Sequence, residues 1–148
     1  MLPEEIIQSE LELLNETVEY YSANPARRCV THSACYYSPE KAGKPGLSEG
    51  CAIGRKLDPQ TRLIFDSQGI GGIRRVLKRK DLVEMLPESL RLMEEKFLVM
   101  VQSLHDNDEF WTEISISEKG TEEVERIKDY LKTADKIKEN LKSKDGKE

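Results

Sequence analysis

Cys51 and His105 are the two side chains through which this sequence could perform covalent chemistry. Ser48 is placed to cap a short helix with Cys51 in its first turn, where a thiol has the lowered pKa that a nucleophile needs. His105 would then act as the general base, with Asp106 or Asp108 orienting its ring. The alternative is structural: Cys51 packs as a small apolar residue, and His105 interacts with the carbonyl end of its own helix.

A second kind of chemistry, zinc binding, is suggested by the spacing C-x2-H-x2-C. Cys29, His32 and Cys35 have this spacing, and Cys51 follows them as a possible fourth ligand. A structural zinc site usually contains two close pairs of ligands, whereas this sequence has one cluster and a lone cysteine. In an extended chain, moreover, Cys29 and His32 would lie on opposite faces. We therefore predict no metal site and no cofactor, and keep a zinc-stabilised module as the third hypothesis for function.

An amphipathic helix over roughly residues 3–22 is the first element that could position these residues. Pro3 suits the first turn of a helix, and the residue before Pro25 avoids the helical region, so the helix should end there. Its main apolar stripe consists of Ile7, Leu11, Leu14, Val18 and Tyr21, and a second row consists of Ile6, Leu13 and Tyr20.

The two rows together make a wider apolar surface than packing against one helix requires. We expect one row to face the core and part of the other to contact a second copy or a protein partner. The last helix of the chain is the alternative cover. On the first view, a charged residue in place of Leu13 should weaken self-association without unfolding the domain.

The segment that holds the cysteines is predicted to be a small, irregular β element. Residues 29–37 are rich in types that favour extended structure, and residues 38–50 contain the signals of a loop. Residues 51–57 fit a strand or a short helix, with a slight preference for the helix. Residues 62–65 are predicted to form a short strand after the stop signal Asp58-Pro59.

The second half of the sequence is predicted to be helical. Asp81 and Glu84 have the spacing of a capping box for a short helix that ends before Pro87. A longer helix should then continue to His105, and Thr121 should cap a last one. The predicted fold class is therefore α+β, predominantly helical, with four or five helices around the small β element. We expect a single domain over residues 1–142 and a frayed, charged tail over residues 143–148.

Composition narrows the classes of function. The chain has 148 residues and a net charge of −5, so nucleic-acid binding is not expected. The basic cluster at residues 74–80 has no interleaved aromatic residues, and we interpret it as a solvated helix face. No apolar run approaches the roughly 20 residues that span a bilayer, and no signal peptide is recognisable, so we expect a cytoplasmic protein without membrane contact. The odd count of three cysteines fits reduced thiols.

Several short motifs resemble those of small phage and prophage proteins of uncharacterised function. The motifs are Arg28-x-Val30, Cys35-x-Tyr37, Gly50-Cys51-Ala52-Ile53-Gly54 and Leu104-His105-Asp106, and the resemblance covers roughly residues 10–115. It implies that one cluster contains Cys35, Tyr37, Cys51, Gly54, His105 and Asp106. The resemblance does not extend to Cys29 and His32, and it brings no mechanism with it.

These observations favour a small, non-catalytic binding or regulatory protein, phage- or prophage-derived, that acts through a protein partner or as a homo-oligomer by means of its first helix. The alternative is a cysteine-dependent hydrolase or transferase that uses Cys51, His105 and Asp106. Cys35, Tyr37, Gly54 and Arg55 are the candidates for the surrounding ligand site or cluster.

Overall fold

The computed structural model describes residues 3–31 and 35–145, with side chains up to residue 134. Its α-helices are α1 (Pro3–Ala23), α2 (Pro59–Ser67), α3 (Ile73–Leu77), α4 (Lys80–Val83), α5 (Glu88–Arg91), α6 (Glu95–Asp106) and α7 (Glu118–Asp145). Three short 3-10 helices occupy Pro25–Arg27, Gly54–Lys56 and Asp108–Phe110.

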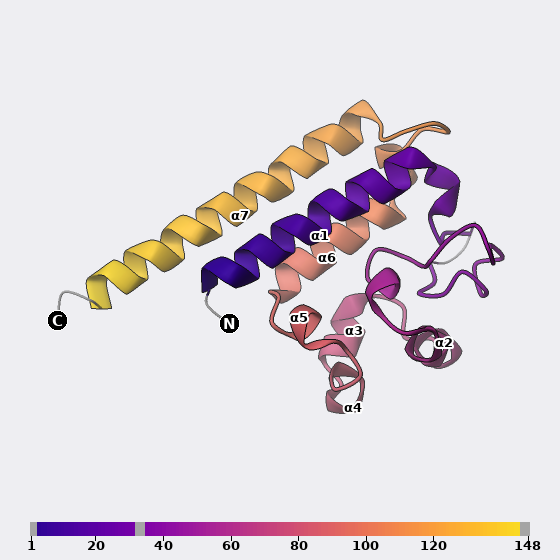
Figure 1. The fold of residues 1–148 in the computed structure, drawn as a ribbon, viewed down its shortest axis with the longest axis horizontal. Helices are drawn as coiled ribbons and strands as arrows, with labels where there is room; N and C mark the ends of the chain where they lie inside the picture. The colour runs from indigo at the N-terminus through magenta and orange to yellow at the C-terminus, as the bar shows by residue number, and fades with distance from the viewer. Residues whose placement is uncertain (1–2, 32–34, 146–148) are drawn as a thin grey trace.

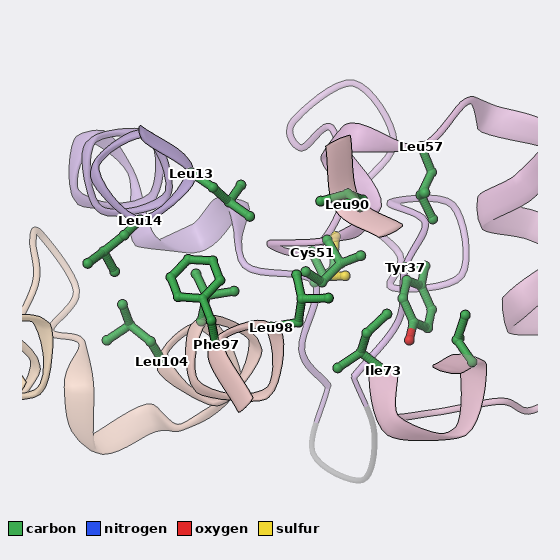
Figure 2. Packing of buried hydrophobic residues seen from close by; sticks show 14 of the residues in the cluster. Leu13, Leu14, Tyr37, Cys51, Leu57, Ile73, Leu90, Phe97, Leu98 and Leu104 are labelled. Carbon is green, nitrogen blue, oxygen red and sulfur yellow. The ribbon is translucent and has the colours of Figure 1, made fainter. Parts of the chain in front are cut away.

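Three long helices, α1, α6 and α7, lie side by side and form the main body of the protein (Figure 1). The apolar stripe of α1 is directed at α6: Figure 2 shows Leu13 and Leu14 facing Phe97 and Leu104. All four side chains are at least 97% buried. Apolar burial between these helices is therefore the main source of stability in this part of the molecule.

The short helices α2 to α5 form a second group beside one end of α6 (Figure 1). α3 packs against both α4 and α6, and Ile73 and Val76 of α3 are fully buried. Residues 28–31 and 35–57 run between this group and the three long helices (Figure 1). The segment that carries the candidate chemistry therefore links the two groups of helices.

The predicted α+β class is wrong, because the described residues contain helices and no β-strand. Two isolated antiparallel bridges, Val30 with Cys35 and Trp111 with Ile116, are the extended pairings found there. Backbone groups that a β ladder would satisfy are bonded to side chains instead: Tyr37 N–H donates to Asp66, and Cys29 N–H donates to His105. Since these bonds already satisfy the backbone, the β-favouring residues need no partner strand.

Residues 62–65, predicted as a strand, belong to helix α2. Asp58-Pro59 starts this helix and does not act as a stop: the Asp58 carboxylate accepts the Thr61 N–H at 2.8 Å, and Pro59 occupies the first turn. Residues 51–57 contain only turns and the 3-10 helix Gly54–Lys56.

The helix predicted from Pro87 to His105 is divided into α5 and α6. The division coincides with a buried side chain of α1, since the Glu10 carboxylate accepts the Glu94 N–H at 3.2 Å where α6 begins. Glu94 in turn accepts the Tyr130 hydroxyl of α7 at 2.6 Å. The predicted capping box at Asp81 is not formed, because Asp81 lies inside α4 and pairs with Arg79.

The predicted first helix is confirmed within one residue, and the last helix starts before Thr121 and continues to Asp145. No helix in the described ranges is long and apolar enough to cross a bilayer. Leu13, the residue expected to be available for self-association, is only 3% exposed. The second row of α1 therefore contributes to the core, and Leu13 is not an assembly contact.

Replacing Leu13 should destabilise the fold. We expect Leu13→Ala to lower the free energy of unfolding by about 2–5 kcal/mol, the usual cost of a cavity at a buried leucine. Leu92, which is 37% exposed, provides the control, and Leu92→Ala should change stability by less than about 1 kcal/mol. Urea unfolding of both variants measures the difference, and equal stabilities would contradict the buried position of Leu13.

Candidate functional site

The residues with candidate chemistry gather around the carboxyl end of α6. The last carbonyl groups of a helix have no partners within the helix and must be satisfied from outside. Arg28 supplies donors here: its Nε donates to the His105 carbonyl at 2.6 Å and its Nη2 to the Asp106 carbonyl at 3.0 Å. The same Nη2 forms an ion pair with Asp108 at 2.9 Å. A buried cation therefore holds the end of α6, where the helix dipole favours positive charge.

His105 is fully buried, and both of its ring nitrogens are engaged. Nε2 accepts the Cys29 N–H at 3.1 Å, and Nδ1 lies 2.7 Å from an Asp106 carboxylate oxygen. Because a backbone N–H can only donate, Nε2 is unprotonated and Nδ1 carries the proton that is donated to Asp106. Burial lowers the pKa of His105 and outweighs Asp106, which acts in the opposite direction. His105 is thus a neutral, structural imidazole.

Tyr21 connects the end of α1 to this centre. Its ring meets the His105 ring edge-on, with 4.8 Å between the centroids. Its hydroxyl donates to the Gly50 carbonyl at 2.5 Å, and the residue is fully buried. Burial raises the pKa of Tyr21 well above its usual value, so this phenol remains protonated as a hydrogen-bond donor.

Cys51 lies in a tightly packed turn. It is 1% exposed, which confirms the predicted burial, and its sulfur accepts the Gly54 N–H at 3.2 Å. A Cβ atom added to Gly54 would overlap the Tyr37 carbonyl oxygen, so the backbones at Gly54 and Tyr37 approach more closely than a side chain permits. Burial raises the pKa of the Cys51 thiol, which is the reverse of what nucleophilic activation needs.

Asp66 is an organising residue of this segment that the sequence analysis did not identify. Its two carboxylate oxygens accept the backbone N–H groups of Tyr37 and Ser38, both at 2.9 Å, and one also accepts the Ser38 hydroxyl at 2.5 Å. Asp66 lies near the end of α2, so it fixes the cysteine-containing segment to that helix. A single aspartate near the end of a short helix gives no sequence signal of such a long-range role.

The two remaining cysteines also have raised pKa values. The buried Cys29 thiol lies 3.3 Å from the Ser48 hydroxyl, and burial is the largest cause of its shift. Cys35 is half-buried next to Asp106, and burial followed by the charge of that carboxylate raises its pKa to about 12. His32 lies outside the described residues, so the candidate zinc ligand set of the third hypothesis stays untested. Among the residues described, no three His, Cys, Asp or Glu side chains converge on a possible metal position.

Arg55 packs against the carboxyl end of α1. Its guanidinium carbon lies 4.3 Å from the Tyr20 ring centroid and 5.6 Å from that of Tyr21. The side chain is only 3% exposed and pairs with Glu16, while Nε and Nη1 have no hydrogen-bond partner. Stacking on the two rings offsets part of the cost of burying this cation.

The structure therefore divides the predicted site residues into two small groups, one around Asp106 and one around Gly54. The structure brings His105 to Asp106, Cys35 to Asp106, and Cys51 and Tyr37 to Gly54. It leaves no ring nitrogen of His105 available to take a proton from Cys51, because both already have partners. This geometry supports a structural role for these residues and does not support the alternative of a cysteine nucleophile with a histidine base.

The lowered pKa of His105 should make stability depend on pH. Below the pKa of an unfolded histidine, about 6.5, the unfolded chain binds a proton that the folded chain does not, so stability falls with decreasing pH. Between pH 7.5 and 5.5 the wild type should therefore lose stability faster than His105→Gln, by at most about 1.4 kcal/mol per pH unit. Urea midpoints across this range measure the difference, and parallel curves for the two proteins would contradict the assignment.

The Cys51 thiol should resist alkylation in the folded protein. We expect iodoacetamide at pH 8 to modify Cys51 at least about 100-fold more slowly in the native state than in guanidinium, because the thiolate is disfavoured and enclosed. Mass spectrometry of peptides gives the rate for each cysteine, and Cys51→Ala identifies the peptide. Native-state modification at the rate of a free thiol would restore the enzymatic alternative.

Comparison of the chain with protein-family models, with curated proteins and with solved structures finds no match. The resemblance to small phage and prophage proteins thus stays a hypothesis that rests on the short motifs around Cys35, Cys51 and His105.

Proposed function

We propose that this chain is a non-catalytic binding protein that acts through a protein partner, and that the partner docks on the first helix. The observation that carries the proposal is a groove of about 470 Å³ between α1 and α7. Ile7 and Leu11 of α1 line it and are only half-buried. Both ring nitrogens of His105 already have partners and Cys51 is buried, and these facts support the non-catalytic part of the proposal.

The groove has the shape and chemistry to accept an amphipathic helix. Its lining combines apolar residues with Glu4 on the α1 side and with Lys128 and Lys132 on the α7 side. A helix that fits must present an apolar stripe, basic residues towards α1 and acidic residues towards α7. The two differently charged sides would also set the direction in which that helix lies.

Charge favours a foreign partner over a second copy. Helix α1 contains six glutamates and no basic residue. In a two-fold dimer built through α1, the same acidic surface would face itself, and like charges at an interface oppose association. We therefore propose a partner of different sequence. The odd number of cysteines further supports a reducing compartment, and we propose the cytoplasm as the site of action.

Selection from a displayed library of helical peptides would test the groove directly. Selected peptides should share apolar residues at spacings of three and four, with a basic flank and an acidic flank. Lys132→Glu should weaken their binding at least about tenfold, since it reverses an exposed charge in the groove. Lys119→Glu, the same change elsewhere on α7, is the matched control and should have no effect.

Two outcomes would contradict the proposal. The first is selected peptides that bind Lys132→Glu and the wild type equally well, which would place their site elsewhere. The second is a stoichiometric dimer in light scattering that Lys132→Glu dissociates, since a second copy of the chain would then occupy the groove.

A further inference from the structure

A second pocket, separate from the α1–α7 groove, lies between the start of α3 and the last turns of α6. Its volume is about 420 Å³, within the range of pockets that hold small molecules. Gln102 of α6 forms part of its wall and is 93% buried. The Gln102 Oε1 accepts the Ile73 N–H at 2.8 Å, so the pocket is built on a direct hydrogen bond between the two helices.

Tyr37 lies behind this wall and is not among the residues that line the pocket. The residue is only 1% exposed, and its hydroxyl interacts with the Gln102 side chain. Figure 2 shows the hydroxyl turned towards the side on which Ile73 lies. Gln102 therefore interacts with both Tyr37 and Ile73, and these interactions hold it in place in the wall of the pocket.

The pocket contains charges of both signs. Arg74 enters from α3 with an exposed side chain, and Asp106 enters from α6. Ser103 and Asn107 add uncharged polar groups and are bonded to each other, with Asn107 Nδ2 donating to the Ser103 hydroxyl at 2.9 Å. A purely anionic ligand would be repelled by Asp106, and a purely cationic one by Arg74, whereas a molecule with one charge of each sign can pair with both.

We propose that this pocket binds a free α-amino acid with an apolar side chain. Its carboxylate pairs with Arg74, because a guanidinium group recognises a carboxylate through two parallel hydrogen bonds. Its ammonium group pairs with Asp106, which already accepts a hydrogen bond from His105 and is thereby held in place. Its side chain lies against Val99, the partly exposed apolar residue of the wall. This site does not depend on the α1–α7 groove.

Calorimetric titration of the full chain with L-leucine tests the proposal. We expect millimolar or tighter binding, and Arg74→Ala should weaken it at least about tenfold through loss of the charged hydrogen bonds. Arg75→Ala is the matched control, since Arg75 is the adjacent exposed arginine of α3 and does not line the pocket.

Two analogues test the requirement for both charges. 4-Methylpentanoate lacks the ammonium group of leucine, 3-methylbutylamine lacks the carboxylate, and both should bind at least about tenfold more weakly than leucine. Equal binding of either analogue would overturn the assignment of a zwitterion. Two results would overturn the site itself. One is no binding of leucine at a concentration of about 10 mM, since the proposal expects millimolar affinity. The other is equal binding of leucine to the wild type and to Arg74→Ala.

Discussion

The rest of the structure depends on one constraint: the last backbone carbonyl groups of α6 have no partner within the helix and need donors from elsewhere. The Leu104 and His105 carbonyl groups are buried where water cannot satisfy them, so residues outside the helix must supply the donors. Arg28 donates to the carbonyls of His105 and Asp106, and the indole N–H of Trp111 donates to the Leu104 carbonyl at 2.8 Å. The chain before α2 and the chain after α6 are both fixed by this one helix end.

The need to pair buried polar groups also explains why residues that resemble catalytic groups are unreactive. Burying a cation or an imidazole is costly unless most of its polar atoms are paired. Arg28 and His105 bond to backbone groups and to neighbouring carboxylates, and this pairing leaves no ring nitrogen of His105 free to exchange a proton. Cys51 is unreactive for a related reason. Close packing buries its thiol, which raises the pKa, and places its sulfur where it accepts the Gly54 N–H.

Apolar periodicity predicted the first helix well. The repeat of apolar residues every three or four positions located α1 within one residue, because such a helix is determined by a single buried face. Asp58-Pro59 failed as a signal because the same two residues can end one element or begin the next. The pairing of His105 with Asp106 was visible as a neighbouring pair, whereas the bonds from Arg28 and Asp66 join residues far apart in sequence. A single sequence contains no record of such contacts, and they replaced the predicted β ladder.

Helix α6 is fixed at both ends, and this determines how the two proposed surfaces relate to one another. Glu10 of α1 accepts the N–H of Glu94 at its start, and Arg28 holds its end. One proposed surface uses α1 and α7, which pack on α6, and the other uses α3, which is bonded to α6 through Gln102. Each surface is therefore shaped by elements that rest on the same immobilised helix. Binding at either surface leaves the buried polar residues around His105 in place. These residues can therefore remain fully buried and still support the two binding surfaces.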